Sequence, residues 1–427
     1  MNFSSEFMFG AATAAHQVEG NNIHSDYWAM EQMKYSSFAE PSNDAVDHYN
    51  RYMEDILLLK NAGLNTYRFS IEWARIEPEE GKYSEAEVKH YREMLQFCIE
   101  NKITPIVTLH HFSSPAWLIT KGGWATDYVV DAFAKYCHYI VQELGQYMNY
   151  ICTINEANMG FQLQKIVEEY RKAAQNSQSQ ESANKNGDVQ VGINMDMEKI
   201  MLGMQEQGGI FHCNPSEIHP YLSGRTEEQE MIVMRAHQAA VKAIKEVNAD
   251  LKVGLTLSLF DYQPTEDGQE MSDKLWREDF GIYLPFFRED DFLGVQNYSR
   301  KIVGVNGTLQ PAEDAPLTQM GYEDYPQALG NVVRRVAKDF HGELIVTENG
   351  LATADDERRC AFIQEALQGL ASCVEEGIPV RGYCYWSLLD NFEWQAGYDK
   401  TFGLIAVDRK TQKRYPKKSL NYMKNIK

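Results

Sequence analysis

The chain has few of the features that mark membrane proteins or nucleic-acid-binding proteins. It contains no apolar run of about 18 residues or more, which is the length that a membrane-spanning helix needs. Its 41 Lys and Arg residues stand against 61 Asp and Glu residues, a net charge of −20. A field of this sign repels a phosphate backbone. We therefore expect neither a nucleic-acid partner nor a membrane partner.

Cysteine is also sparse. The seven cysteines are odd in number and scattered, and no CxxC pair occurs, which favours small buried side chains in a reducing compartment. The apolar stretch at residues 8–15 weakly resembles the core of a signal peptide, but Glu6 precedes it and no Lys or Arg does. We expect a cytoplasmic protein.

The length and composition indicate a large globular core. At 427 residues the chain exceeds the usual size of one domain, while 44% hydrophobic and 24% charged residues are ordinary values for a folded interior. Two ordinary domains would fit this length. An α/β barrel, which is one of the few architectures that grow so large around a single core, would fit it as well.

Short β-branched runs alternate with long amphipathic stretches along most of the chain, which is typical of repeated βα units. The predicted strands are 7–11, 65–69, 103–109, 150–154, 252–257, 292–296, 344–347 and 382–386. The predicted helices are 45–61, 84–100, 127–146, 226–247, 325–340 and 355–376. Eight strands with intervening helices predict an α/β fold, a single (β/α)₈ barrel over residues 1–427, with loop elaborations at its C-terminal mouth.

Residues 171–225 interrupt this alternation. They are polar and rich in turn residues, and they follow the fourth strand, where a barrel places its loops over the C-terminal mouth. Two roles stay open for this segment, a surface excursion or a grip on the outer part of a substrate. His212, Cys213 and His219 lie within it, but their spacing fits no common zinc pattern, so we expect no metal site.

Two predicted strands run directly into a glutamate. Glu156 follows the fourth strand and Glu348 follows the seventh, so the two side chains should face each other across the mouth of the barrel. Two facing carboxyl groups can cleave a glycosidic bond, since a protonated one assists the leaving oxygen while an ionised one attacks or activates water. Their separation in sequence does not choose between retention and inversion.

Other polar and aromatic residues stand at the neighbouring strand ends. Asn155 supplies an amide for a sugar hydroxyl, and Arg68 can hold a carboxylate ionised. His111 closes the third strand, where it can bind a hydroxyl or simply pack. The eighth strand leads into Trp386, and the segment after it contains Glu393 and Trp394. Aromatic faces stack on a pyranose ring while carboxylates accept its hydroxyls, so this combination suits a sugar site.

At this point the sequence resembles the family 1 glycoside hydrolases, the retaining β-glucosidase-like enzymes. The resemblance covers most of the chain, from residue 7 to about residue 419. The motifs that carry it are FMFGAATAAHQVEG at 7–20, YRFSIEWARIEP at 67–78, TLHHFSSPAWL at 108–118, GGW at 122–124, TINEAN at 153–158, DFLGVQNYS at 291–299, VTENG at 346–350 and WSLLDNFEWQAGYDKTFGL at 386–404.

The resemblance implies double displacement, with Glu156 as general acid/base and Glu348 as nucleophile. It implies no cofactor and no metal. The residues that it places around a sugar are Asn155 at the 2-hydroxyl, Gln17 and His111 at the 3- and 4-hydroxyls, Glu393 at the 4- and 6-hydroxyls, and Trp386 and Trp394 along the pocket wall. It also implies that Tyr298 and Arg68 hold the nucleophile.

The chain departs from the family pattern at several of these places. Gln296 stands where Asn is commoner, which keeps an amide in support of the site but lengthens it. Ala157 replaces the usual Pro, Asn297 an aromatic residue, and Phe112 a Trp. We expect activity to survive these changes, whereas the fine preference for the sugar depends on them.

The resemblance leaves a choice of substrate class. Glu393 favours unphosphorylated β-glycosides, because a carboxylate would repel a 6-phosphate, and we interpret Lys417 and Lys418 as a solvated run. We expect an exo-acting β-glycosidase, with β-D-glucosides preferred and β-galactosides or β-fucosides as alternatives. A 6-phospho-β-glycosidase and a catalytically silent sugar-binding relative are the other hypotheses. The residues specify neither the aglycone nor the oligomeric state.

Overall fold

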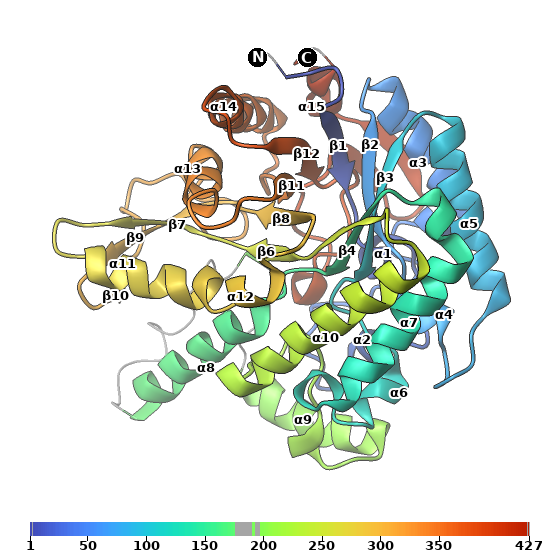
Figure 1. Cartoon of the computed structure of the whole chain (residues 1–427). Helices are drawn as coiled ribbons and strands as arrows, with labels where there is room; N and C mark the ends of the chain where they lie inside the picture. Colours follow the sequence, from blue (N-terminus) through green and yellow to red (C-terminus); the bar gives the residue numbers. More distant parts are fainter. Residues whose placement is uncertain (2, 176–189, 193–196, 425, 427) are drawn as a thin grey trace.

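The computed structural model describes residues 1, 3–175, 190–192, 197–424 and 426, and shows a parallel barrel with helices around it (Figure 1). All eight predicted strands are confirmed, and most of their ends lie within one or two residues of the predicted ends. The barrel strands are β1 Met8–Ala12, β2 Thr66–Ser70, β3 Thr104–His110, β4 Tyr150–Ile154, β5 Lys252–Gly254 with β6 Thr256–Ser258, β8 Phe292–Gln296, β11 Glu343–Asn349 and β12 Val380–Trp386. The predicted (β/α)₈ fold is therefore confirmed.

The fifth barrel strand closes the sheet. The strand order is β5-β4-β3-β2-β1-β12-β11-β8-β6, and β5 and β6 are two halves of one stretch that is interrupted only at Leu255. The first half pairs with β4 and the second half with β8, always in parallel. A Cβ on Gly254 would lie 2.0 Å from the carbonyl oxygen of Phe292, so a residue without a side chain is required where the two edges meet.

The six predicted helices are present on the outside of the barrel (Figure 1). They are α3 His48–Asn61, α5 Glu85–Glu100, α7 Tyr128–Leu144, α10 Glu227–Val247, α13 Ala328–Val336 and α14 Asp356–Glu375. Ser84 caps α5 by accepting a hydrogen bond from the Glu87 amide, and Thr226 and Gln229 form a capping box on α10. These caps satisfy amides that the first helical turn leaves without a partner.

The chain also forms elements that the sequence pattern did not predict. The longer helices among them are α8 Met159–Gln175, α9 Met197–Phe211 and α11 Gln269–Trp276. The shorter helices are α1 Ala15–Val18, α2 Asp26–Glu31, α4 Trp73–Ile76, α6 Ala116–Ile119, α12 Leu284–Phe287 and α15 Lys418–Met423. The strands outside the barrel are β7 Asp261–Pro264, β9 Arg300–Gly304 and β10 Gly307–Thr308 in one small sheet, and β13 Ile405–Asp408 and β14 Lys413–Pro416 in another.

The interpretation of residues 171–225 as a loop is wrong for the part that forms α9. Tertiary contact explains the difference, because the Glu206 carboxylate of α9 accepts hydrogen bonds from the backbone amides of Lys34 and Tyr35, at 2.9 and 3.0 Å. Most of the described side chains of α9 are exposed, apolar ones among them, so the helix depends on partners far away in the sequence. The polar stretch at 176–188 lies outside the described residues.

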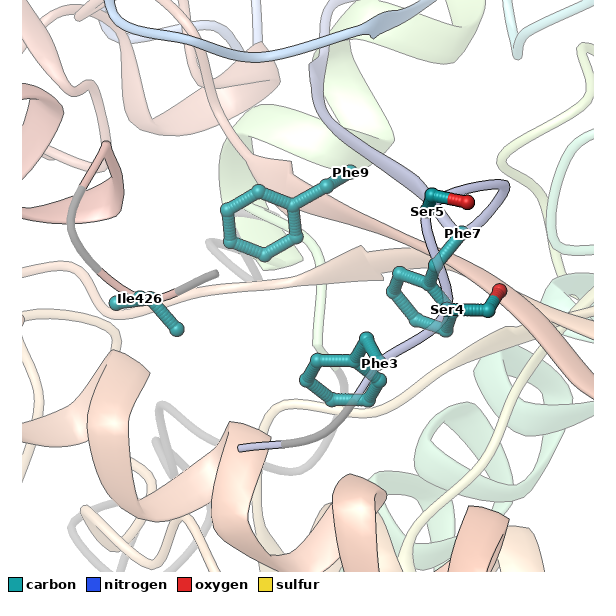
Figure 2. Close-up of a pocket in the computed structure, with 6 residues that line it drawn as sticks. All are labelled: Phe3, Ser4, Ser5, Phe7, Phe9 and Ile426. Atoms are coloured by element: carbon teal, nitrogen blue, oxygen red, sulfur yellow. The ribbon is translucent and has the colours of Figure 1, made fainter.

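The two chain ends lie at one end of the barrel, and α8 and α9 lie at the other (Figure 1). A cavity of about 110 Å³ at the terminal end is lined by Phe3, Ser4, Ser5, Phe7, Phe9 and Ile426 (Figure 2). The rings of Phe3 and Phe7 stack there with centroids 4.3 Å apart. Since β1 begins at this end, the cavity lies at the amino ends of the strands, away from the polar residues of the mouth.

The described part of the chain contains no helix that is both long and apolar enough to cross a bilayer. Nor do three or more His, Cys, Asp or Glu side chains meet there in a way that could hold a metal ion, and His212, Cys213 and His219 form no such group. All seven cysteines carry free thiols, and six of them are buried.

Candidate active site

The polar residues of the predicted site come from different strands and meet at the carboxyl end of the barrel. Arg68 lies in β2, Gln296 ends β8 and Glu348 lies near the end of β11, while Asn155 and Glu156 follow β4. Each of these five side chains belongs to a residue that is no more than 3% exposed. Charged groups buried to this extent need partners, which the following contacts supply.

Three donors hold the carboxylate of Glu348. Arg68 Nη1 lies 2.5 Å from Oε1, and Gln296 Nε2 donates to the same oxygen at 3.0 Å. The Tyr298 hydroxyl donates to the other oxygen, Oε2, at 2.5 Å. Charge-assisted hydrogen bonds of this kind favour the ionised form and fix its orientation.

Asn155 connects this carboxylate to His111. Its Oδ1 accepts from Arg68 Nη2 at 2.6 Å and from Gln296 Nε2 at 2.8 Å, so the amide group has one orientation. Its Nδ2 then donates to His111 Nε2 at 3.2 Å, which assigns the imidazole proton to Nδ1. Burial holds the pKa of His111 well below its usual range, so the ring is neutral.

Glu156 sits in a strained backbone conformation, with φ at 45° in the left-handed region. The neighbouring strand β6 holds it there. Thr256 Oγ1 accepts from the Glu156 amide at 2.8 Å, and the Thr256 carbonyl accepts from the Ala157 amide at 2.9 Å. These two bonds determine where the chain turns from β4 toward α8, and therefore where the Glu156 side chain begins.

The pKa values of the two glutamates are shifted by different surroundings. Burial raises the pKa of Glu156 well above its usual range, and the negative charge of Glu348 raises it further. Burial also raises the pKa of Glu348, but Arg68 and the hydrogen bonds from Tyr298 and Gln296 oppose that rise. A proton shared by this pair therefore lies on Glu156.

A second buried carboxylate lies beside Gln17. Gln17 Nε2 donates to the Phe392 carbonyl at 2.7 Å and to Glu393 Oε2 at 3.3 Å, and the Gly192 amide donates to Glu393 Oε1 at 3.2 Å. Burial raises the pKa of Glu393 to about 8, although the hydrogen bond from Gly192 opposes the rise. The carboxyl group is thus ready to accept or share further hydrogen bonds near neutral pH.

Aromatic rings surround His111. Its ring lies nearly parallel to Trp386, with centroids 5.8 Å apart, and to Trp394, with centroids 5.9 Å apart. Phe112 contacts Trp394 at 5.1 Å. All eleven side chains that the sequence predicted for the site are thus buried. Eight of them are connected by hydrogen bonds or ring contacts, Gln17 and Glu393 form a second bonded pair, and Glu156 follows Asn155 in the chain.

Several polar atoms of this region have no hydrogen-bond partner among the described residues. They include Gln17 Oε1, His111 Nδ1 and Gln296 Oε1, each of them buried. Polar atoms inside a folded protein are normally paired, and those at a binding site are available to a ligand. The two amide oxygens can accept hydrogen bonds and the imidazole nitrogen can donate one. A sugar ring with several hydroxyls can pair with all three atoms.

Three residues of this region were not predicted from the sequence. Thr256 and Ser258 end the fifth barrel strand, and Gln190 belongs to the polar segment after the fourth. The first two could have been found, since they follow the same rule of strand ends that selected Glu156 and Glu348. No signal in the sequence pointed to Gln190.

The interpretation of Lys417 as a solvated residue is wrong. Its Nζ lies 2.8 Å from the Asp390 carboxylate, and its side chain is 16% exposed. Lys418 does lie at the surface, where it pairs with Glu357. The tight ion pair of Lys417 with Asp390 became visible only when the end of the chain folded back against the segment after β12.

A pair of buried carboxyl groups, one bound by an arginine and one with a pKa well above its usual range, stands beside aromatic rings and unpaired polar atoms at the mouth of a (β/α)₈ barrel. This fold and site define a glycoside hydrolase.

Comparison with known proteins gives the family. The model of "Glycosyl hydrolase family 1" matches residues 1–186 and 295–427, and the chain belongs to this family. It is similar to β-glucosidase A of Thermotoga maritima, at 28% identity over 99% of this chain and 97% of that protein. It is also similar to a 6-phospho-β-galactosidase of Clostridium acetobutylicum, at 27% identity over 100% of this chain and 97% of that protein.

Among solved structures, the chain is similar to the β-glycosidase BGL167. The identity is 41%, the TM-score is 0.86, and the similarity covers 99% of this chain and 96% of that one. The protein is therefore a β-glycosidase of this family, and its substrates are glycosides.

Proposed function

We propose that the protein is a retaining exo-β-glycosidase that hydrolyses unphosphorylated β-glycosides, preferably β-D-glucosides. The observation that carries this proposal is the unequal treatment of two buried carboxyl groups. Three donors bind Glu348, while Glu156 is buried with the negative charge of Glu348 nearby. One group is equipped to attack and the other to carry a proton.

In the first step, a Glu348 oxygen attacks the anomeric carbon of the sugar. The bond from this carbon to the glycosidic oxygen breaks, and Glu156 gives its proton to that oxygen, so that the aglycone leaves as a neutral alcohol. The sugar is then bound to Glu348 as an ester. Arg68 and Tyr298 stabilise the Glu348 carboxylate before attack and hold its position.

In the second step, Glu156 acts as a base. The negative charge of Glu348 is one cause of the raised pKa of Glu156, and the ester no longer carries that charge. The pKa of Glu156 therefore falls once the ester forms, and its carboxylate can remove a proton from water. The water attacks the anomeric carbon, Glu348 is released, and the sugar keeps its original configuration.

The polar and aromatic groups around Glu393 support the proposed glucoside preference. Gln17 Oε1 and His111 Nδ1 can accept from and donate to neighbouring ring hydroxyls, and Glu393 can accept two more. Trp386 and Trp394 supply apolar faces for the ring. Several similar proteins carry the name β-glucosidase, including the one from Thermotoga maritima.

A 6-phospho-β-glycosidase is the second candidate, because two proteins named 6-phospho-β-galactosidase match the chain at 27% and 28% identity. Two features argue against it. The Lys417 ammonium is already bound to Asp390, and the buried carboxyl group of Glu393 supplies acceptors rather than the cationic donors that suit a phosphate. Rates on p-nitrophenyl β-glucoside and on its 6-phosphate separate the two candidates. We expect the unphosphorylated compound to react at least tenfold faster, and a preference for the phosphate would decide for the second candidate.

The nucleophile is tested by Glu348→Ala with an activated aryl β-glucoside. Hydrolysis should fall by several orders of magnitude, and added azide should restore part of the turnover, because the small anion fits the space left by the carboxylate. The restored product should be the α-glycosyl azide, detected by NMR. A variant that azide does not rescue, or a β-configured product, would contradict the role of Glu348.

A further inference from the structure

Residues 190–192 enter the mouth of the barrel and lie against the site. Gln190 is 4% exposed and Val191 5%, and Gly192 is buried as well. These three residues come from the polar segment between β4 and α10, a region that the family model matches only in part. We call them the mouth strap.

Within the described part of the chain, four hydrogen bonds of the mouth strap reach a residue of the site or its neighbour. The Tyr298 amide donates to Gln190 Oε1 at 2.7 Å, and Gln190 Nε2 donates to Ser258 Oγ at 2.9 Å. The Gly192 amide donates to Glu393 Oε1 at 3.2 Å, and the Gln395 amide donates to the Gly192 carbonyl at 3.1 Å.

The approach of the strap to Glu393 requires a glycine. A Cβ added to Gly192 would lie 2.4 Å from the Glu393 carbonyl oxygen and 3.0 Å from its Cγ. Any other residue would push the backbone away and lengthen the bond from the Gly192 amide. The glycine thus places a backbone N–H on an oxygen that the proposed function assigns to the sugar.

Gln190 determines the direction of the Ser258 hydroxyl. The Tyr298 amide binds the oxygen of the Gln190 side chain, so its nitrogen faces Ser258 and donates to Oγ. A serine hydroxyl has one hydrogen and two lone pairs, and with a lone pair occupied by Gln190 its hydrogen is available to Glu156. Ser258 lies close enough to the Glu156 side chain for its hydroxyl to lower the pKa of Glu156.

We propose that the mouth strap is a positioning element of the site, in which Gln190 directs the Ser258 hydroxyl toward Glu156 and Gly192 holds one oxygen of Glu393. The inference rests on the proposed function, because it assumes that Glu156 carries the proton. Gln190 acts through Ser258 and is a positioning residue rather than a catalytic one.

Several charged or titratable groups face Glu156. The carboxylates of Glu348 on β11 and Glu393 after β12 raise its pKa, and Arg68 on β2 lowers it. The phenols of Tyr298, Tyr221 and Tyr322 lie close enough for Glu156 to raise their own pKa values. Against these groups, the Ser258 hydroxyl supplies a hydrogen bond that favours the ionised form of Glu156.

Gln190→Leu and Ser258→Ala test the proposal through the pH profile of kcat/KM on an aryl β-glucoside. Losing the directed hydroxyl removes a bond to the ionised form, so the pKa of Glu156 rises. The alkaline limb should move upward by about 0.5–1 pH unit in each variant, since one hydrogen bond contributes on the order of 1 kcal/mol. Gln190→Glu should shift it the same way, because a carboxylate accepts the Ser258 hydrogen.

The double variant Gln190→Leu/Ser258→Ala makes the test specific. If Gln190 acts through Ser258, the double variant should shift the limb no further than Ser258→Ala alone, whereas independent effects would add. Gln164→Leu is the matched control, a half-buried glutamine of α8 that donates to Glu168 and should leave the profile unchanged.

Two results would overturn the inference. One is an alkaline limb of the kcat/KM profile that shifts in Ser258→Ala but not in Gln190→Leu. The other is a shift in the double variant that equals the sum of the two single shifts. A failure of the proposed function itself looks different. In that case Glu156→Ala would slow substrates with poor and good leaving groups equally, whatever the strap variants do.

Discussion

At the scale of single residues, Glu156 and Glu348 have the same side chain and the same 3% exposure but different neighbours. Arg68, Tyr298 and Gln296 all donate to Glu348, whereas Ser258 is the one hydroxyl among the largest influences on the pKa of Glu156. Burial raises both pKa values, and the donors oppose the rise mainly at Glu348. Chemical identity therefore does not assign the roles that we propose, and the neighbours do.

The coupling between the two carboxyl groups can be measured in Glu348→Gln. This change removes the negative charge that contributes to the raised pKa of Glu156, so we expect that pKa to fall by about one unit or more. Titration of ¹³C-labelled glutamate carboxyl groups by NMR follows it directly. A pKa of Glu156 that stays constant or rises would show that Glu348 is not its main charged neighbour.

At the scale of elements, the barrel strands and the helices differ in how well the sequence predicts them. The strands are short runs, rich in β-branched and aromatic residues, that are buried on both faces, which is a strong local signal. Helix α9 has no comparable signal, and it is held by the bonds from Glu206 to Lys34 and Tyr35. In the small sheet, β7 pairs with β9, a strand distant in sequence, whereas β9 and β10 form a short hairpin.

One buried ion pair fixes α10 beside the start of α8. Arg225 Nε lies 2.6 Å from Glu230 Oε2, both side chains are fully buried, and the Arg225 amide donates to the Gly160 carbonyl at 3.0 Å. Tyr283 donates to the other Glu230 oxygen at 3.0 Å. The Gly160 carbonyl that Arg225 binds lies four residues beyond Glu156 in the chain. The ion pair therefore supports the turn that carries the proposed acid/base.

Arg225→Met should therefore destabilise the protein strongly. It leaves the Glu230 carboxylate buried without its cation, which costs about 3–5 kcal/mol of unfolding free energy. Urea unfolding followed by tryptophan fluorescence measures the change. Arg51→Met is the control, since its pair with Asp47 is 37% and 25% exposed and should contribute less than about 1 kcal/mol. Equal losses in the two variants would contradict this reasoning.

At the scale of the whole molecule, acidic residues are in excess, and the core buries several of them. Asp26 begins α2 and is fully buried, and both the Tyr27 and the Ser114 amides donate to its Oδ1, at 2.8 and 2.9 Å. Burial nevertheless raises its pKa to about 8. The folded protein thus keeps a proton on Asp26 that the unfolded chain releases at much lower pH.

This difference makes stability depend on pH. Because the folded state binds the extra proton, the contribution of Asp26 to stability is greatest below about pH 4 and is lost as the pH rises toward 8, by up to about 1.4 kcal/mol per pH unit. Asp26→Asn has no such proton. Its stability relative to the native chain should therefore increase between pH 5 and pH 8 and level off above, as measured by urea unfolding at several pH values. A difference that stays constant with pH would refute the shift.

The sequence by itself determined the elements whose signal is local. Eight apolar runs predicted the barrel strands, and the rule that polar residues at strand ends face the mouth selected Glu156 and Glu348. The motifs around Gln17 and Glu393 indicated the family that the comparison then showed. Local patterns suffice here because a strand buried on both faces and a residue at its end are defined by a few neighbours in the chain.

Only the tertiary structure decided which groups touch. Asn155 joins Arg68, Gln296 and His111, which are separated from it by 87, 141 and 44 positions in the chain. Gln190 reaches Tyr298 over 108 positions, and Lys417 reaches Asp390 rather than solvent. Hydrogen-bond partners and burial set each pKa, and both are properties of space rather than of sequence order, so they emerge only when the barrel closes.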